Sequence, residues 1–146
     1  MSDSDLIKLY SQRILALAAD VPHVGRLAAP DASVRKRSPL CGSAVTVDLV
    51  VKDGRIAEYA QEVRACALGQ AAAAVLGHVV LGLTRAEIEA GRDGLRAMLK
   101  DGAPPPDAPF DGYAALEPAR DYKNRHASIL LAIEATAEAM AAAEAG

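Results

Sequence analysis

Apolar and polar residues alternate through residues 44–52, and again less regularly through residues 55–63. A period of two is typical of a β-strand with one buried face. The two segments are separated by Asp53-Gly54, a dipeptide that favours the tight turn of a two-residue hairpin. The pattern therefore predicts an antiparallel hairpin, and a shorter apolar and charged segment at residues 34–38 is a candidate third strand.

The rest of the chain shows the period of about 3.6 residues that is typical of helices. Thr84 and Glu87 form a capping-box pattern that predicts a helix start. Four prolines and two glycines between residues 101 and 112 predict a loop. We expect helices from the N-terminus to just before Pro22 and over residues 67–81, 84–99 and 124–143, with a short helical piece at 113–119.

Together these elements predict one domain over residues 1–146, in the α+β class. We expect a three-stranded antiparallel sheet with the helices packed on one face, and the loops that carry the chemistry grouped at one end. Aromatic residues make up only 3% of the chain and there is no Trp, so the core must be built from Ala, Leu, Val and Ile.

Charge and hydropathy narrow the function classes. The formal net charge of −3 argues against a nucleic-acid scaffold. We see neither a signal-peptide pattern nor an apolar run of the ~18 residues that a membrane helix needs. We expect a cytoplasmic protein with no membrane association, in which paired cysteines more often indicate metal or catalysis than a structural disulfide.

The two cysteines of the chain, Cys41 and Cys66, flank the predicted hairpin. If the turn centres between Asp53 and Gly54, cross-strand partners sum to about 107 in residue number, which pairs Cys41 with Cys66. Two converging thiols indicate a site for metal, sulfur or redox chemistry. The alternative is that both are small buried core residues.

Several features near the cysteines favour thiolate over thiol. Positive charge precedes Cys41 in Arg35-Lys36-Arg37, and Arg64 lies two residues before Cys66. Cys66 also falls at the start of the predicted helix, where the dipole is positive. His126 lies in the first turn of the last predicted helix, as either a third ligand or a hydrogen-bonding residue at the helix start.

These motifs, taken in order, resemble the NifU/IscU/SufU-type iron–sulfur cluster scaffold family over nearly the whole chain. The insertion at about residues 84–118 resembles its SufU-like branch. The segments that carry the resemblance are Leu9-Tyr10, Pro22 to Gly25, Pro39-Leu40-Cys41-Gly42, Cys66 and Arg125-His126-Ala127-Ser128-Ile129-Leu130.

The chain departs from the family pattern at two ligand positions. Ser43 stands where the family has an Asp, and Ala127 stands where it has a third Cys. Residues 120–124 lack a counterpart of the Leu-Pro-Pro-Val-Lys motif of the IscU branch, and Arg125 is displaced by one from the Arg of the SufU branch. The ligand set is therefore incomplete by the family's standard.

The resemblance implies a non-enzymatic scaffold for iron–sulfur cluster assembly, or a sulfur acceptor, that works with a cysteine desulfurase and passes its cargo to recipient apoproteins. It implies an iron–sulfur cluster or iron, or alternatively zinc, bound by Cys41, Cys66 and His126, with Ser43 as a weak hydroxyl ligand. Cys41 or Cys66 would accept persulfide sulfur. We expect a monomer or a weak dimer.

Two other interpretations remain open. A degenerate paralogue would bind zinc or no metal and act through protein–protein contacts. A thiol redox protein would use Cys41 and Cys66 as a reversible pair, although the Cys-x-x-Cys spacing and the βαβ context of such proteins are missing.

Overall fold

The computed structural model describes residues 10–39 and 42–145. Three antiparallel strands form one sheet in the order β1-β2-β3. Their bounds are Ala32–Arg37 for β1, Ala44–Lys52 for β2 and Arg55–Arg64 for β3. The predicted hairpin and the three-stranded antiparallel sheet are confirmed, with β1 starting two residues earlier than the sequence pattern indicated.

A β-bulge shifts the register of the hairpin. Near the turn Val51 faces Ile56, but the next pair is Val50 with Glu58, so Ala57 is an extra residue on β3. Partner numbers therefore sum to 108 beyond the bulge, and the ladder ends with Ala44 opposite Arg64. One inserted residue moves every later pair, so the predicted sum of 107 is wrong for the described pairs beyond the bulge. Cys41 lies outside the described residues, and its predicted place near Cys66 stays a prediction.

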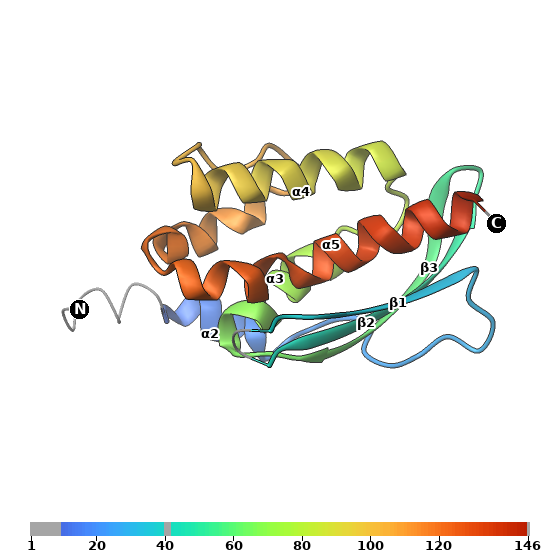
Figure 1. Cartoon of the computed structure of the whole chain (residues 1–146), viewed down its shortest axis with the longest axis horizontal. Coiled ribbons are helices and arrows are strands. Elements are labelled where there is room, and N and C mark those ends of the chain that lie inside the picture. The colour runs from blue at the N-terminus through green and yellow to red at the C-terminus, as the bar shows by residue number, and fades with distance from the viewer. Residues whose placement is uncertain (1–9, 40–41, 146) are drawn as a thin grey trace.

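The helices cover one face of the sheet, as predicted (Figure 1). The long C-terminal helix lies along the strands beside the helix Ala67–Gly77, and the helix Arg85–Lys100 packs on its far side, away from the sheet (Figure 1). The helices are α2 (Gln12–Ala18), α3 (Ala67–Gly77), α4 (Arg85–Lys100), the 3-10 helix η1 (Asp111–Asp121) and α5 (Lys123–Ala145).

Two helix ends differ from the predictions. The helix expected from the N-terminus does not run through Tyr10, since α2 begins at Gln12 with Ser11 as its cap; residues 1–9 lie outside the described chain. Helix α3 ends at Gly77, not at residue 81, because the chain turns back to the sheet, where the Gly82 amide donates to Ile56 at 2.8 Å. The capping box that opens α4 is confirmed.

A buried hydroxyl pair fastens β3 to α5. The Thr136 hydroxyl donates to the Ala132 carbonyl at 2.8 Å, so the Tyr59 hydroxyl must donate to Thr136, also at 2.8 Å. Burial raises the pKa of Tyr59 far above its usual value.

Among the residues that the structure describes, no helix has the length and hydropathy to cross a membrane.

The outer face of the sheet carries a buried carboxylate. The alternation in β2 is typical of a strand whose polar residues face solvent, but Asp48 is only 1% exposed. Residues 22–31 cross this face and hydrogen-bond to the strands at Gln61 and Leu49. The cover comes from a segment that is distant in sequence, so strand periodicity gives no sign of it.

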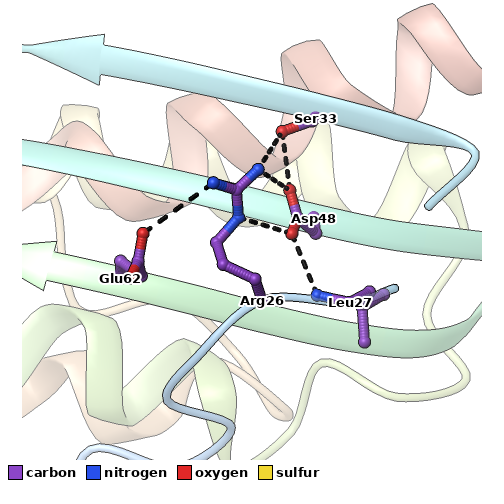
Figure 2. A network of polar contacts seen from close by, with 5 residues as sticks. All are labelled: Arg26, Leu27, Ser33, Asp48 and Glu62. Carbon is purple, nitrogen blue, oxygen red and sulfur yellow. Dashed lines mark hydrogen bonds and ion pairs between the residues drawn. The ribbon is translucent and has the colours of Figure 1, made fainter. Parts of the chain in front are cut away.

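Four donors satisfy Asp48, three of them from the crossing segment (Figure 2). Arg26 donates through Nε at 2.7 Å and Nη2 at 3.1 Å, the Leu27 amide donates at 3.0 Å, and the Ser33 hydroxyl of β1 donates at 2.6 Å. Burial alone would raise the pKa of Asp48, but the hydrogen bonds from Arg26, Ser33 and Leu27 outweigh burial and hold this pKa below its usual range.

Replacing Asp48 should therefore change both stability and its pH dependence. Because the pKa of Asp48 is lower in the folded state, its stabilisation is fully present above the unfolded pKa of about 4 and is lost as pH falls through the folded pKa. We expect Asp48→Asn to lower the free energy of unfolding by about 2 kcal/mol at neutral pH, with a smaller loss in acid. Urea unfolding over a pH series measures both effects.

Asp107→Asn is the matched control, since this aspartate is exposed in the loop after α4. It should leave stability nearly unchanged at every pH. A loss in Asp48→Asn that stays constant through the acid range would contradict the role assigned to the carboxylate charge.

Candidate functional site

Three segments that are far apart in the sequence meet at one end of the sheet. Ser43 directly precedes β2, Cys66 directly precedes α3, and Ser128 lies in the second turn of α5. The Ser128 hydroxyl is 3.1 Å from the Ser43 hydroxyl and 3.7 Å from the Cys66 sulfur. Ser128 thus connects two of the sequence-predicted site residues, and we call these three residues the serine–cysteine junction.

Cys66 is the N-cap residue of α3, as the sequence predicted. Its backbone carbonyl accepts the first bond of the helix, from Gln70 at 3.0 Å, but its side chain makes no capping hydrogen bond. The thiol is free and half-buried. The sulfur is therefore not used to build the helix start, and it remains available for chemistry beside Ser128.

The polar groups around Cys66 at the junction are neutral. Ser43 is 3% exposed and Ser128 is 1% exposed. Hydroxyl oxygens carry no formal charge, unlike an aspartate carboxylate at the same place. The backbone of Ser43 is fixed by Ser38, whose amide donates to the Ser43 carbonyl at 2.8 Å. Cys41 lies outside the described residues, so its predicted place beside Cys66 stays a prediction.

Gly69 makes room for Ser128. A Cβ at residue 69 would lie 2.6 Å from the Ser128 Oγ, 2.7 Å from the Ala65 Cβ and 3.2 Å from the Ser128 carbonyl oxygen. Real Cβ contacts are never this short, so α3 and α5 pass this closely only because residue 69 is a glycine. The sequence patterns did not identify Gly69, and they placed Ser128 in a family-like segment without a role in the site. One available signal was the four-residue spacing of Ser128, Ala132 and Thr136, which places two hydroxyls on one buried helix face.

His126 faces the end of η1. Its Nε2 lies 2.9 Å from the Arg120 carbonyl oxygen and 3.1 Å from that of Ala119, and the ring is buried. Carbonyl oxygens only accept, so Nε2 carries a proton, and in the neutral form of the ring Nδ1 is the nitrogen with a lone pair. In residues 10–39 and 42–145, no three His, Cys, Asp or Glu side chains form a group that would hold a metal ion. The role of His126 as a ligand stays a prediction.

Ala127 lies on the wall of a cavity of about 720 Å³ between the C-terminal end of α4, η1 and α5. His126 and Leu130 line the same cavity, with Lys100 and Lys123 at its edge. The Ala127 side chain is half-buried. A larger side chain at residue 127 therefore has space beside it in this cavity.

The profile of the family described as the NifU-like N terminal domain matches residues 9–128. No curated protein matches the chain. A crystal structure of a nitrogen-fixing NifU-like protein (N-terminal) from Brucella abortus is 43% identical, with a TM-score of 0.94, over 97% of this chain and 98% of that one.

Two more distant structures share the fold. A putative iron–sulfur cluster assembly scaffold protein for the SUF system from Fervidobacterium islandicum has 19% identity and a TM-score of 0.83, over 92% of this chain and 98% of that one. A hypothetical protein solved at 2.3 Å resolution has 20% identity and a TM-score of 0.76, with the same coverage.

The contact between Gly69 and Ser128 gives a prediction for a double-mutant cycle. Gly to Ala inside a helix is ordinarily stabilising by about 1 kcal/mol. Here Gly69→Ala should instead destabilise by about 1–3 kcal/mol, because the new methyl group overlaps Ser128 and Ala65. Ser128→Ala removes one of the overlapping atoms, so the double variant should lose less than the sum of the single losses, by about 1 kcal/mol. Urea unfolding of the four proteins measures the coupling.

Gly94→Ala is the control, since a Cβ there would meet Pro106 only at 3.3 Å. It should be far better tolerated than Gly69→Ala. Strict additivity of Gly69→Ala and Ser128→Ala would contradict the close approach of α3 and α5 at this point.

Proposed function

Because the chain belongs to the NifU-like N-terminal domain family, we propose that it is an iron–sulfur cluster assembly scaffold or sulfur acceptor that works with a cysteine desulfurase. In this role the protein is not an enzyme, and the cluster is its cargo, to be passed to recipient apoproteins. The observation that carries the proposal is the serine–cysteine junction, where residues of all three family ligand segments, Ser43, Cys66 and Ser128, meet at a free thiol.

The proposed ligands are Cys41, Cys66 and His126, with Ser43 as a weak fourth. Thiolate sulfur suits iron, iron–sulfur clusters and zinc, and imidazole suits iron and zinc. The availability of the Cys66 sulfur, which makes no capping bond, supports its part in this set. The tautomer of His126 supports Nδ1 as the ligating nitrogen, since Nε2 is held by carbonyls of η1.

Sulfur delivery fits the same thiols. In this step a thiolate of Cys41 or Cys66 attacks the outer sulfur of a desulfurase persulfide, and the desulfurase thiolate leaves. The neutral hydroxyl of Ser43 is a weaker metal ligand than the carboxylate of the family pattern, and Ala127 supplies no thiolate. We therefore expect cargo that is held loosely and released readily.

A second candidate function is that of a degenerate paralogue that binds zinc or no metal and acts through protein–protein contacts. Two observations favour it. Ala127 supplies no thiol beside the junction, and Nε2 of His126 already has two hydrogen-bond acceptors.

Anaerobic reconstitution tests the first proposal against the second. The chain is incubated with ferrous iron, cysteine and a cysteine desulfurase, then desalted and assayed for iron, acid-labile sulfide and visible absorption. The scaffold proposal expects bound iron and sulfide in the parent, a large loss in Cys66→Ala and Cys41→Ala, and a smaller loss in His126→Ala. Sulfide no higher than in a mock reaction without desulfurase would support the paralogue.

Restoring the missing ligand should strengthen metal binding. Ala and Cys are both small, and the cavity beside residue 127 has room for a sulfur atom. Excess zinc should therefore raise the thermal midpoint of Ala127→Cys, alone or with Ser43→Asp, by more than it raises that of the parent. The reason is that metal binding to the folded state adds stability. Differential scanning fluorimetry with and without zinc measures the shift.

Ala142→Cys is the matched control, because it adds an exposed thiol about 22 Å further along α5. It should behave as the parent does. An equal zinc-induced increase in thermal midpoint in Ala127→Cys and Ala142→Cys would show that the start of α5 is not part of the metal site.

A further inference from the structure

The outer face of the sheet is positively charged at its Cys66 end. Two rows of residues cross the strands there: Arg37, Ala44 and Arg64 form the last row, and Arg35, Thr46 and Glu62 form the row before it. All four charged residues in these rows are exposed, whereas Ala44 is buried. We call Arg35, Arg37 and Arg64 the arginine patch.

The arginine patch has no acidic partner among the residues that the structure describes. Glu62 is the nearest candidate by strand pairing, but it faces the guanidinium of Arg26 at 3.9 Å (Figure 2). Arg26 in turn is held by Asp48 at 2.7 Å. This part of the sheet therefore carries four arginines against two carboxylates, although the whole chain has a net charge of −3.

The patch borders a groove of about 730 Å³ whose wall includes Arg26, Arg35, Arg64 and Val24. Ala44 and Thr46 are small lining residues between the arginines. Val24 is 71% exposed and adds an apolar contact at the rim. The groove thus combines arginine cations and the Glu62 carboxylate with a small apolar surface. The helices cover the opposite face of the sheet (Figure 1).

We propose that the arginine patch docks an acidic segment of a protein partner and brings it to Cys66. Arg37 and Arg64 lie on strands two apart, so their backbones are about 10 Å apart. Cations at this spacing match separate carboxylates along a chain better than they match one small anion. Guanidinium groups pair well with carboxylates, and charge at a rim raises association rates and selects partners.

The arginine patch lies close to Cys66 along the chain. Arg64 precedes Cys66 by two residues, which span at most about 7 Å of extended chain. A segment held on the patch therefore lies at the end of the sheet where Cys66 is found. The proposal depends on charge placement alone, so a failure to bind a cluster would leave it standing.

Affinity labelling of Cys66 tests the proposal. The probe is a synthetic peptide with glutamate at every third position and a chloroacetamide group at one end, and alkylation is located by mass spectrometry. At low salt the peptide should alkylate Cys66 with a rate that saturates in peptide concentration. In a variant with Arg35→Gln, Arg37→Gln and Arg64→Gln the half-saturating concentration should rise about tenfold. The rate with free chloroacetamide is measured for each protein, so that any change in the intrinsic reactivity of the thiol is separated from the change in half-saturation.

A variant with Arg13→Gln, Lys52→Gln and Lys100→Gln is the matched control, because it loses the same charge at exposed positions elsewhere. It should keep the parent's half-saturation. Equal weakening in the two variants would show an effect of net charge only and overturn the proposal. Complete inhibition of the Cys66 alkylation by millimolar phosphate would also overturn the proposal. So would a lower half-saturating concentration for an oligothymidylate that carries the same chloroacetamide group than for the peptide.

Discussion

The close packing of α3 against α5 is the contact on which the functional end of the molecule depends. Gly69 lets the two helices approach until the Ser128 hydroxyl fills the space that a side chain at residue 69 would occupy. That approach brings α5 to the start of both β2 and α3, and so creates the serine–cysteine junction. Four consecutive buried alanines, Ala71 to Ala74, follow Gly69 in α3, and small side chains are what a short interhelical distance requires.

The two faces of the sheet are stabilised in different ways. The inner face packs apolar side chains under α5 and α3, with the Tyr59–Thr136 hydroxyl pair as its buried polar contact to α5. The outer face is closed at one end by residues 22–31 and the Asp48 network (Figure 2). It is open at the Cys66 end, where the arginines are exposed. Burial and charge thus divide the outer face into a stabilised half and an accessible half.

Much of the fold could be predicted from the sequence because its signals are local. The Asp53-Gly54 turn and the Thr84–Glu87 capping box each depend on a few adjacent residues, and the structure contains both. The bulge at Ala57 and the burial of Asp48 could not be predicted in this way. One inserted residue leaves no periodic trace, and Asp48 is covered by Arg26 from 22 residues earlier.

The candidate site was predictable to a similar extent. Cys66 at the start of α3 followed from a strand pattern giving way to a helix pattern. Ser128 did not, since the sequence shows that the second turn of α5 is apolar on one side but not which residue meets α3. The orientation of His126 toward η1 likewise depends on where an irregular segment ends, and no pattern in the sequence fixes that point.

The metal and sulfide content of the protein as it is purified from cells tests the central claim most directly. The chain is purified without oxygen and without added metal, and iron, zinc and acid-labile sulfide are determined per chain. The scaffold account predicts iron and sulfide in equal amounts, both lost on brief exposure to a chelator because the ligand set holds its cargo loosely. Zinc at one per chain without sulfide, or no metal at all, would contradict it.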